Sequence, residues 1–298
     1  KKGQNMIRGI YSATLSLIKD DLTLDVDETI GHAVNSIRSG LAGTIFFGST
    51  GMSQLISLNE KKELISKIAH NKFKQQFYLG TGCNSLNENL DLIGYGMEFG
   101  FSTYLIMPSA YYPNVSDDGV FNFYSIIINR FPKIKIILYN FEKLSKYLFS
   151  IDSVNRLVKA FPKNIIGVKD SSYNLFEKLK IENLLVFPGS EAKLLKGLEI
   201  GCAGCISAVT NLTHSLAKKV FDDFEKKVPQ TMNEKLISVR ETFDNYNLIP
   251  AVHSFASTSS EKYENLLPPL TALSKEKQKE LLGKLKRLDF TPNKDGTT

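Results

Sequence analysis

Residues 77–107 read FYLGTGCNSLNENLDLIGYGMEFGFSTYLIM and contain one complete strand–helix–strand unit. The apolar segments 77–80 and 103–107 have the length and composition of strands that are buried on both faces. Between them, apolar side chains recur at the spacing of one helix face, at Leu86, Leu90, Ile93 and Met97. This face must cover a sheet, so the stretch predicts two parallel strands joined by a helical crossover.

Helix start and stop signals repeat along the chain. Ser85-x-x-Glu88 and Ser57-x-x-Glu60 are predicted capping boxes, in which a serine and a glutamate satisfy free amides of the first helical turn. Glycine takes a positive φ at low cost and therefore often ends a helix. Three glycines stand between a helical stretch and the next strand: Gly40, Gly100 and Gly201. The order helix, glycine, turn and strand predicts repeated βα units.

Alternating strand and helix patterns run from residue 7 to about residue 212. The candidate strands are centred on residues 7–11, 44–47, 77–80, 103–107, 134–139, 165–169, 184–187 and 203–207. Eight parallel strands close a barrel, so we predict an α/β protein with a (β/α)₈ TIM barrel over residues 1–212. Helical patterns at 216–224, 236–246 and 275–288 then predict a C-terminal helical appendage over residues 213–290. Residues 291–298 are expected to be frayed.

The overall composition limits the class of protein. Of 298 residues, 42% are hydrophobic and 23% charged, which is ordinary for a globular protein. No apolar run is long enough to cross a bilayer, and the first residues lack the apolar stretch of a secretory signal. We therefore expect a cytoplasmic protein that does not insert into a membrane.

The charge pattern argues against a nucleic-acid-binding surface, and the spacing of cysteines and histidines argues against a metal site. The net charge is +6, but lysines alternate with acidic residues, as in residues 275–280, which indicates a solvated helix face. A mildly basic protein still favours anionic small-molecule substrates. The three cysteines and four histidines lack the spacing of metal ligands or of a disulfide framework. We expect no metal site, and cysteines that are small buried side chains.

Lys169 is the clearest candidate for chemistry. It follows the apolar segment 164–168, which should place its amine at the mouth of the barrel, where TIM-barrel active sites lie. Desolvation disfavours the ammonium form, and a neutral lysine amine can condense with a ketone. The resulting iminium withdraws electrons from the neighbouring carbon, so carbon–carbon bonds can be made or broken without a metal. From position alone, a lysine that reaches solvent or pairs with Asp170 is the simpler interpretation.

Two further candidates end neighbouring strands. Tyr139 ends the apolar strand that precedes the strand of Lys169. Its phenol could transfer protons during imine formation. A core aromatic residue whose hydroxyl reaches solvent explains this position equally well. The loop Gly48-Ser49-Thr50-Gly51 could bind a carboxylate through its amides and hydroxyls. A plain structural turn explains this tetrapeptide as well.

Together these segments resemble the dihydrodipicolinate synthase and N-acetylneuraminate lyase family of class I aldolases, over roughly residues 7–290. The residues that carry the resemblance are Gly48-Ser49-Thr50-Gly51, Tyr111-Tyr112, Tyr139-Asn140, Gly167-Val168-Lys169-Asp170-Ser171-Ser172 and Gly204-Cys205-Ile206-Ser207. The resemblance implies that Lys169 forms a Schiff base with a 2-oxo acid and that Tyr139 relays protons. The covalent imine would take the place of a cofactor.

The resemblance also implies a binding site and an assembly. Ser49 and Thr50 would hold the carboxylate of the 2-oxo acid, and the backbone at Ile206 would line the pyruvate pocket. Tyr112 would complete a relay in the neighbouring subunit of a homo-oligomer, a dimer or a tetramer.

Three departures from the family pattern bear on the second substrate. Met52 stands where the family loop usually has glutamate, and Glu142 replaces a common proline. Leu144 stands where the synthases carry an arginine that holds the carboxylate of the aldehyde substrate. Lys143 or Lys146 could supply a point charge, but neither reproduces the two-pronged geometry of arginine.

We therefore favour a metal-independent Schiff-base lyase or aldolase that uses or releases pyruvate, acting on a sugar-acid-like 2-oxo acid. The alternative is a dihydrodipicolinate synthase that condenses pyruvate with aspartate semialdehyde. A third hypothesis is a catalytically silent barrel that binds a small 2-oxo acid.

Overall fold

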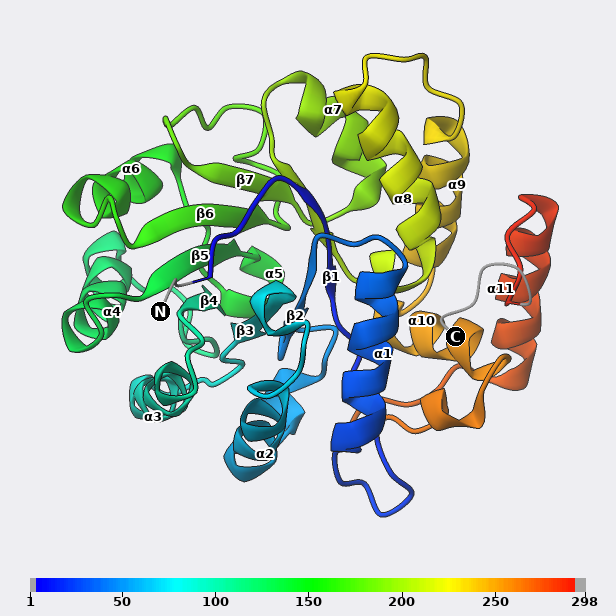
Figure 1. Ribbon diagram of the computed structural model, residues 1–298, viewed down its shortest axis with the longest axis horizontal. Coiled ribbons are helices and arrows are strands. Elements are labelled where there is room, and N and C mark those ends of the chain that lie inside the picture. The colour runs from blue at the N-terminus through cyan, green and yellow to red at the C-terminus, as the bar shows by residue number, and fades with distance from the viewer. Residues whose placement is uncertain (1–3, 293–298) are drawn as a thin grey trace.

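The computed structural model describes residues 4–292, so most of the predicted frayed tail lies outside the described residues. Eight parallel strands form one sheet in the order β7-β6-β5-β4-β3-β2-β1-β8 (Figure 1). Their bounds are β1 Gly9–Ala13, β2 Gly43–Phe46, β3 Phe77–Gly80, β4 Thr103–Ile106, β5 Lys135–Asn140, β6 Ile165–Asp170, β7 Leu185–Pro188 and β8 Gly204–Ser207. The predicted TIM barrel is confirmed, with the first strand beginning two residues later than expected.

The sheet curls into a nearly closed barrel. β1 pairs with both β2 and β8, so the first and the last strand of the chain lie side by side. Between β7 and β8, the Ala203 amide donates to the Val186 carbonyl at 2.9 Å and bridges the remaining gap. The barrel interior is filled by buried side chains, among them Tyr11, Tyr78 and Phe187, whose rings make edge-to-face contacts.

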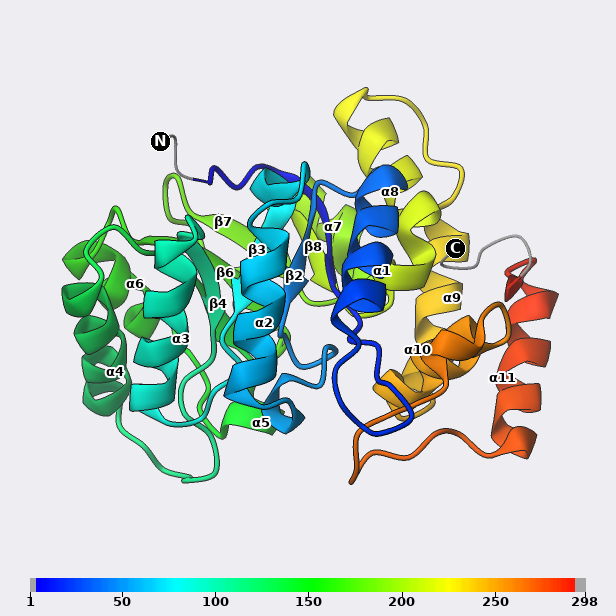
Figure 2. The ribbon, with the colours of Figure 1, turned by 60° about the horizontal axis from the view of Figure 1, so that its bottom comes forward.

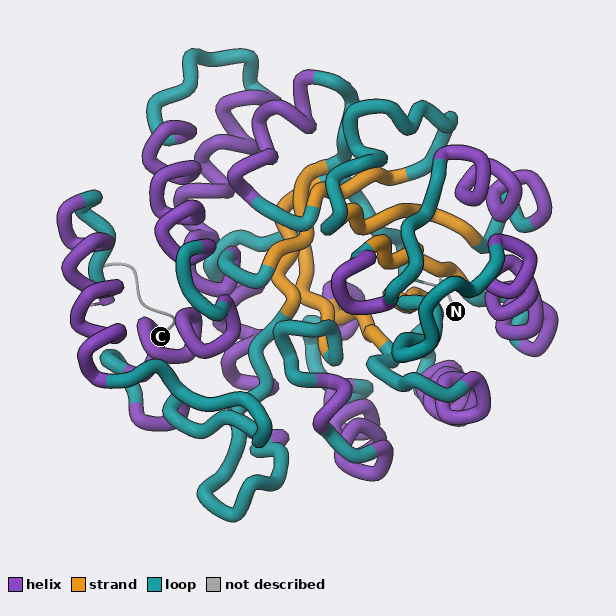
Figure 3. The backbone as a smooth tube through the Cα atoms, turned by 180° about the vertical axis from the view of Figure 1, so that it is seen from behind, coloured by secondary structure: helices purple, strands orange, loops and turns teal. Residues whose placement is uncertain are grey.

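Helices surround the strands, and Figure 3 shows this ring from behind. The α-helices that follow the first five strands are α1 Val26–Arg38, α2 Leu58–Ile68, α3 Leu86–Glu98, α4 Asp117–Arg130, the short α5 Glu142–Ser145 and α6 Ile151–Ala160. Then come α7 Leu194–Glu199, α8 Thr210–Glu225, α9 Asn233–Asp244, α10 Leu248–Ser257 and α11 Lys275–Arg287. The connection from β6 to β7, residues 171–184, contains turns and no helix.

The predicted helix signals operate largely as expected. Ser57 and Glu60 form a complete capping box at α2. At α3, the Ser85 hydroxyl accepts a hydrogen bond from the Glu88 amide, and only this half of the predicted box forms in the described structure. The three predicted stop glycines have φ of 102°, 87° and 101°, the region that only glycine adopts at low cost: Gly40, Gly100 and Gly201.

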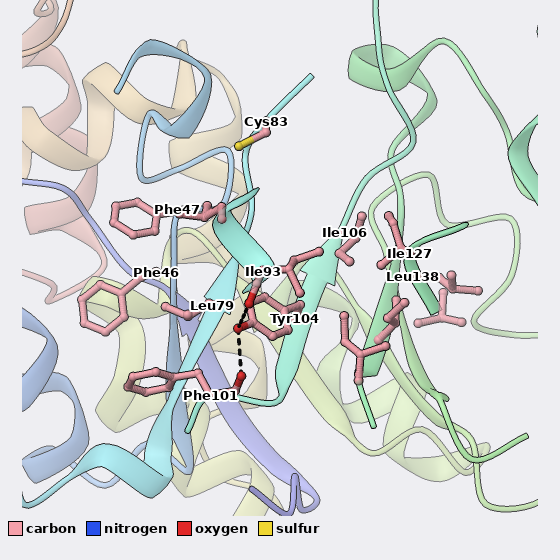
Figure 4. Close-up of a cluster of buried hydrophobic side chains, with 14 of the residues drawn as sticks. Phe46, Phe47, Leu79, Cys83, Ile93, Phe101, Tyr104, Ile106, Ile127 and Leu138 are labelled. Carbon is pink, nitrogen blue, oxygen red and sulfur yellow. Dashed lines mark hydrogen bonds between the residues drawn. The ribbon is translucent and has the colours of Figure 1, made fainter. Parts of the chain in front are cut away.

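The outer core lies between the strands and the helices (Figure 4). Tyr104 of β4 points outward and donates its hydroxyl to the Phe101 carbonyl at 2.8 Å, close to the Ile93 carbonyl of α3. Gly96 lets α3 approach this closely, because a Cβ at that position would overlap the Tyr104 hydroxyl. This packing holds α3 on the outside of β3 and β4 and leaves their C-terminal ends open for function.

The C-terminal helices lie on one side of the barrel, beside α1 and α8 (Figure 2). α8 packs on β1 and crosses residue 213, where the predicted helical region begins. α10 was not predicted, because it opens with five successive apolar residues, 248–252, and such a run does not distinguish a helix from a strand. Its residues are nearly all buried, which places this helix between the barrel and α11.

Candidate active site

Lys169 and Tyr139 meet at the C-terminal ends of β6 and β5, where the two residues are direct register partners. The Lys169 Nζ donates to the Tyr139 Oη at 3.3 Å and lies 4.4 Å from the centre of the tyrosine ring. Lys169 is only 4% exposed and Tyr139 6%. The barrel therefore holds a lysine amine in a confined place next to a phenol.

Asp170, the next residue, points to the other face of β6, because side chains alternate along a strand. Its carboxylate accepts four hydrogen bonds, from the Asn140 side chain and from the amides of Tyr173, Leu175 and Phe176. Asp170 thus orders the turn after β6 and is not the partner of Lys169. The simpler interpretation of Lys169, a lysine in solvent or paired with Asp170, is wrong.

Ser49 extends the pair into a chain of three polar groups. Its Oγ lies 3.1 Å from the Tyr139 Oη, within hydrogen-bonding distance. The Ser49 carbonyl accepts the Met52 amide at 3.0 Å, and Met52 has a left-handed φ of 54°, which closes the loop after β2 tightly. Thr50 in the same loop is buried. The structure thus brings Ser49, Tyr139 and Lys169 together from three strands.

The remaining predicted site residues lie in two different settings. Ile206 is buried in β8 and belongs to the same interior cluster as Tyr139. Tyr112 is exposed in the loop after β4, where its ring makes an edge-to-face contact with Tyr111. Within this chain, Tyr111 lines the cavity described below and Tyr112 does not.

A cavity of about 580 Å³ opens above Ser49 and Tyr139. The loops after β2, β3 and β4, the short helix α5 and the C-terminal region all contribute to its wall. Leu144 and Lys146 line it, whereas Lys143 does not. Glu142 begins α5, and its amide donates to the Ser172 Oγ at 2.9 Å, a bond that the family's proline could not make.

A buried charged network lies beside the end of β8, and no sequence signal pointed to it. Arg240 of α9 donates to the Glu191 carboxylate at 2.7 Å and to the Ser207 hydroxyl at 2.8 Å. Glu191 also accepts from Ser207 and from Thr213, at 3.0 and 2.6 Å. Burial alone would lower the pKa of Arg240, but Glu191 and Asp244 raise this pKa well above its usual value. Ser207 follows Ile206 directly, so the network fixes the end of β8.

Burial raises the pKa of two further groups, a tyrosine and a cysteine. Burial raises the pKa of Tyr173 to about 12 and that of the Cys205 thiol well above its usual range. All three cysteines are free and buried, as expected.

Among residues 4–292, no three His, Cys, Asp or Glu side chains gather as metal ligands would. None of the helices in the same residues combines the length and apolar composition of a bilayer crossing.

Comparison with known proteins identifies the family. The model of the dihydrodipicolinate synthetase family matches residues 6–288. The chain belongs to this family. Members of the dihydrodipicolinate synthetase family are lyases and aldolases, and the chain is a class I pyruvate-type aldolase of this family.

Individual family relatives are distant. An uncharacterized DapA-like lyase of Chloroflexus aurantiacus is 26% identical, over 90% of this chain and 93% of the relative. A 4-hydroxy-tetrahydrodipicolinate synthase of Leptospira biflexa is 31% identical, over 70% of this chain and 71% of its own. The crystal structure of dihydrodipicolinate synthase from Agrobacterium tumefaciens superposes with a TM-score of 0.85 at 26% identity, covering 94% and 99% of the two chains.

Proposed function

We propose that Lys169 forms a Schiff base with pyruvate or a related 2-oxo acid, and that Tyr139 moves protons to and from the reacting atoms. The observation that carries the proposal is the buried chain Ser49–Tyr139–Lys169 at the C-terminal ends of β2, β5 and β6. Lys169 is almost fully buried beside the phenol, so a 2-oxo acid bound there would meet the amine away from bulk solvent. A lysine amine held in such a place can act as a nucleophile towards a ketone.

The chemistry follows from these positions. The Lys169 amine attacks the ketone carbon of pyruvate, and the ketone oxygen leaves as water after taking up protons, which Tyr139 is placed to deliver. The iminium draws electrons from the methyl carbon, which loses a proton and becomes an enamine. The enamine carbon attacks an aldehyde carbon, the aldehyde oxygen takes a proton, and water releases a 4-hydroxy-2-oxo acid. The reverse sequence is the lyase reaction.

The remaining groups would bind and position the 2-oxo acid. In this proposal, Ser49 and Thr50 in the tight loop after β2 hold its carboxylate, and the backbone at Ile206 in β8 lines its pocket. In this proposal the lysine imine does the work of a cofactor, and no metal takes part. Tyr112, exposed in this chain, would complete a proton relay in a neighbouring copy of a homo-oligomer.

Replacing Tyr139 by phenylalanine is expected to lower kcat by roughly 10²-fold or more, the scale of a general acid–base group. The ring still fills its place, so the fold should change little. Steady-state turnover measures the effect. The matched control is Tyr124→Phe, which removes a buried hydroxyl that donates to the Ile106 carbonyl at 2.7 Å, in the outer core. Equal turnover of Tyr139→Phe and Tyr124→Phe would reduce Tyr139 to a structural aromatic.

For the second substrate, Leu144 favours a molecule without another carboxylate at the pocket entrance. An unpaired desolvated charge costs several kcal/mol, which is roughly a hundredfold or more in specificity. We expect kcat/KM for cleavage of a 3-deoxy-2-oxo sugar acid or sialic acid to exceed that for condensation of pyruvate with aspartate semialdehyde. Leu144→Arg should shift the preference towards the semialdehyde.

The synthase alternative has one feature in its favour, because Lys146 lines the cavity. If the unmodified enzyme prefers aspartate semialdehyde and Lys146→Met removes that preference, Lys146 holds the second carboxylate and the synthase hypothesis is correct. Lys143→Met serves as the control, because Lys143 is exposed and outside the lining.

A further inference from the structure

We infer that the second substrate is an aldehyde with an apolar body, aromatic or branched aliphatic, in place of a hydroxyl-rich or dicarboxylic chain. The inference rests on the proposed Schiff base at Lys169. It keeps the expected preference for a sugar acid over the semialdehyde and puts an aldehyde with an apolar body ahead of both. Its basis is the composition of the cavity wall above Tyr139, which motif positions alone did not reveal.

The wall beyond the reacting groups is mostly hydrocarbon. Apolar side chains come from the loop after β2, from α5 and from the C-terminal region: Phe47, Met52, Leu55, Leu144, Ile249 and Leu270. The volume of about 580 Å³ lies within the usual range for small-molecule sites. Binding in a cavity with such a wall is favoured when the bound molecule buries apolar surface there.

The polar side chains of the lining offer little to a chain of hydroxyl groups. The Asn84 amide is already engaged, because its Oδ1 accepts the Ala110 amide at 2.6 Å. Gln54 is exposed at the entrance. Among the described residues of the lining, Lys146 is the only charged one, and it donates hydrogen bonds without accepting any. Apart from Ser49 and Tyr139, the remaining hydroxyl groups of the lining are those of Ser53 and Tyr111. They are too few for a chain of hydroxyl groups, so a polyol bound here would leave some of its hydroxyls without partners.

The apolar surface continues to the mouth of the cavity. Leu55, Tyr111 and Leu144 are exposed large hydrophobic residues, and all three line this one cavity. Exposed apolar side chains that gather at one site mark a binding site more often than scattered ones do. The same cavity is lined by Ser49 and by Tyr139, the hydrogen-bond partner of Lys169, so the occupant that these apolar side chains fit is the part of the substrate beyond the reacting carbonyl.

The reaction with such a substrate needs no further reagent. The enamine formed from pyruvate and Lys169 attacks the aldehyde carbon, one carbon–carbon bond forms, and the aldehyde oxygen takes the proton that the pyruvate methyl group gave up. Water then hydrolyses the imine and releases a 4-hydroxy-2-oxo acid with an apolar substituent. No oxidant or reductant takes part.

Three aldehydes with the same number of non-hydrogen atoms test the inference: benzaldehyde, erythrose and aspartate semialdehyde. With pyruvate as the partner, kcat/KM for benzaldehyde should exceed that for each of the other two by about tenfold or more. Borohydride trapping of pyruvate on Lys169 is measured in the same preparations. If pyruvate is trapped but erythrose or the semialdehyde reacts better, the inference is wrong and the proposed Schiff-base function stands. If pyruvate is not trapped, the proposed function itself fails.

A pair of exposed leucines provides the matched variants. Leu55 lines the cavity and is 39% exposed, whereas Leu148 is 40% exposed and lies outside the lining. Leu55→Gln should reduce the benzaldehyde preference several-fold, with pyruvate trapping unchanged, and Leu148→Gln should leave the preference as it is. If Leu55→Gln alters the molecular mass of the assembly in solution and leaves the aldehyde preference unchanged, the apolar rim is a subunit interface and the inference is overturned.

Discussion

Incubation with pyruvate and borohydride is expected to add one covalent adduct per chain, on Lys169. The competing candidate is Lys61, which is buried and whose pKa is lowered by that burial. The Lys61 Nζ, however, donates to the carbonyls of Thr81 and Gly82 at 3.0 and 3.2 Å, and Lys61 does not line the cavity. The Lys169 Nζ instead lies 3.3 Å from the Tyr139 Oη, which in turn lies 3.1 Å from the Ser49 Oγ. Mass spectrometry of the intact protein and of its peptides measures the number and the position of the adducts.

Two variants separate these lysines. Lys169→Met should give no adduct with any 2-oxo acid, and Lys61→Met should keep the adduct on Lys169, provided that the variant folds. A chelator should leave the adduct yield unchanged, because imine formation requires only the amine and the ketone. An adduct mapped to another lysine would contradict the proposed mechanism. Absence of any adduct in the unmodified protein would favour the catalytically silent barrel.

Arg240→Ala is expected to lower the free energy of unfolding by roughly 3–5 kcal/mol, because it leaves the buried Glu191 carboxylate without its cationic partner. Glu191 is fully buried, and the two hydroxyl donors that remain, Ser207 and Thr213, carry no charge. Urea denaturation followed by circular dichroism gives the change. Arg240→Lys keeps the positive charge and should recover part of the loss.

An exposed ion pair provides the control for this effect. Arg156 and Asp118 are 2.5 Å apart on the surface, with 46% and 85% of the two side chains exposed. Arg156→Ala should therefore change the free energy of unfolding by about 1 kcal/mol or less. If Arg240→Ala is as mild as Arg156→Ala, the buried network contributes little to stability, and its role in fixing the end of β8 must be abandoned.

The order of strands and helices could be predicted from the sequence, because each rests on short-range chemistry. Strands buried on both faces must be apolar along their length, as at residues 77–80, and a helix that covers them must be apolar on one face. Helix ends follow from local hydrogen bonding and backbone sterics, so Ser57 and Gly100 reveal them. The motif positions of Lys169 and Tyr139 were visible for the same reason, since each ends an apolar strand.

Only the tertiary structure determines the contacts between residues that are far apart in the chain. The register of β5 and β6 places Tyr139 beside Lys169, and the alternation of side chains turns Asp170 away from both. Ile249 and Leu270, from a region assigned to an appendage, line the cavity above Ser49 and Tyr139. The partners Glu191 and Arg240 are separated by the whole of β8 and α8. Local patterns carry no information about such contacts, because burial and the pairing of charges arise only when distant elements pack together.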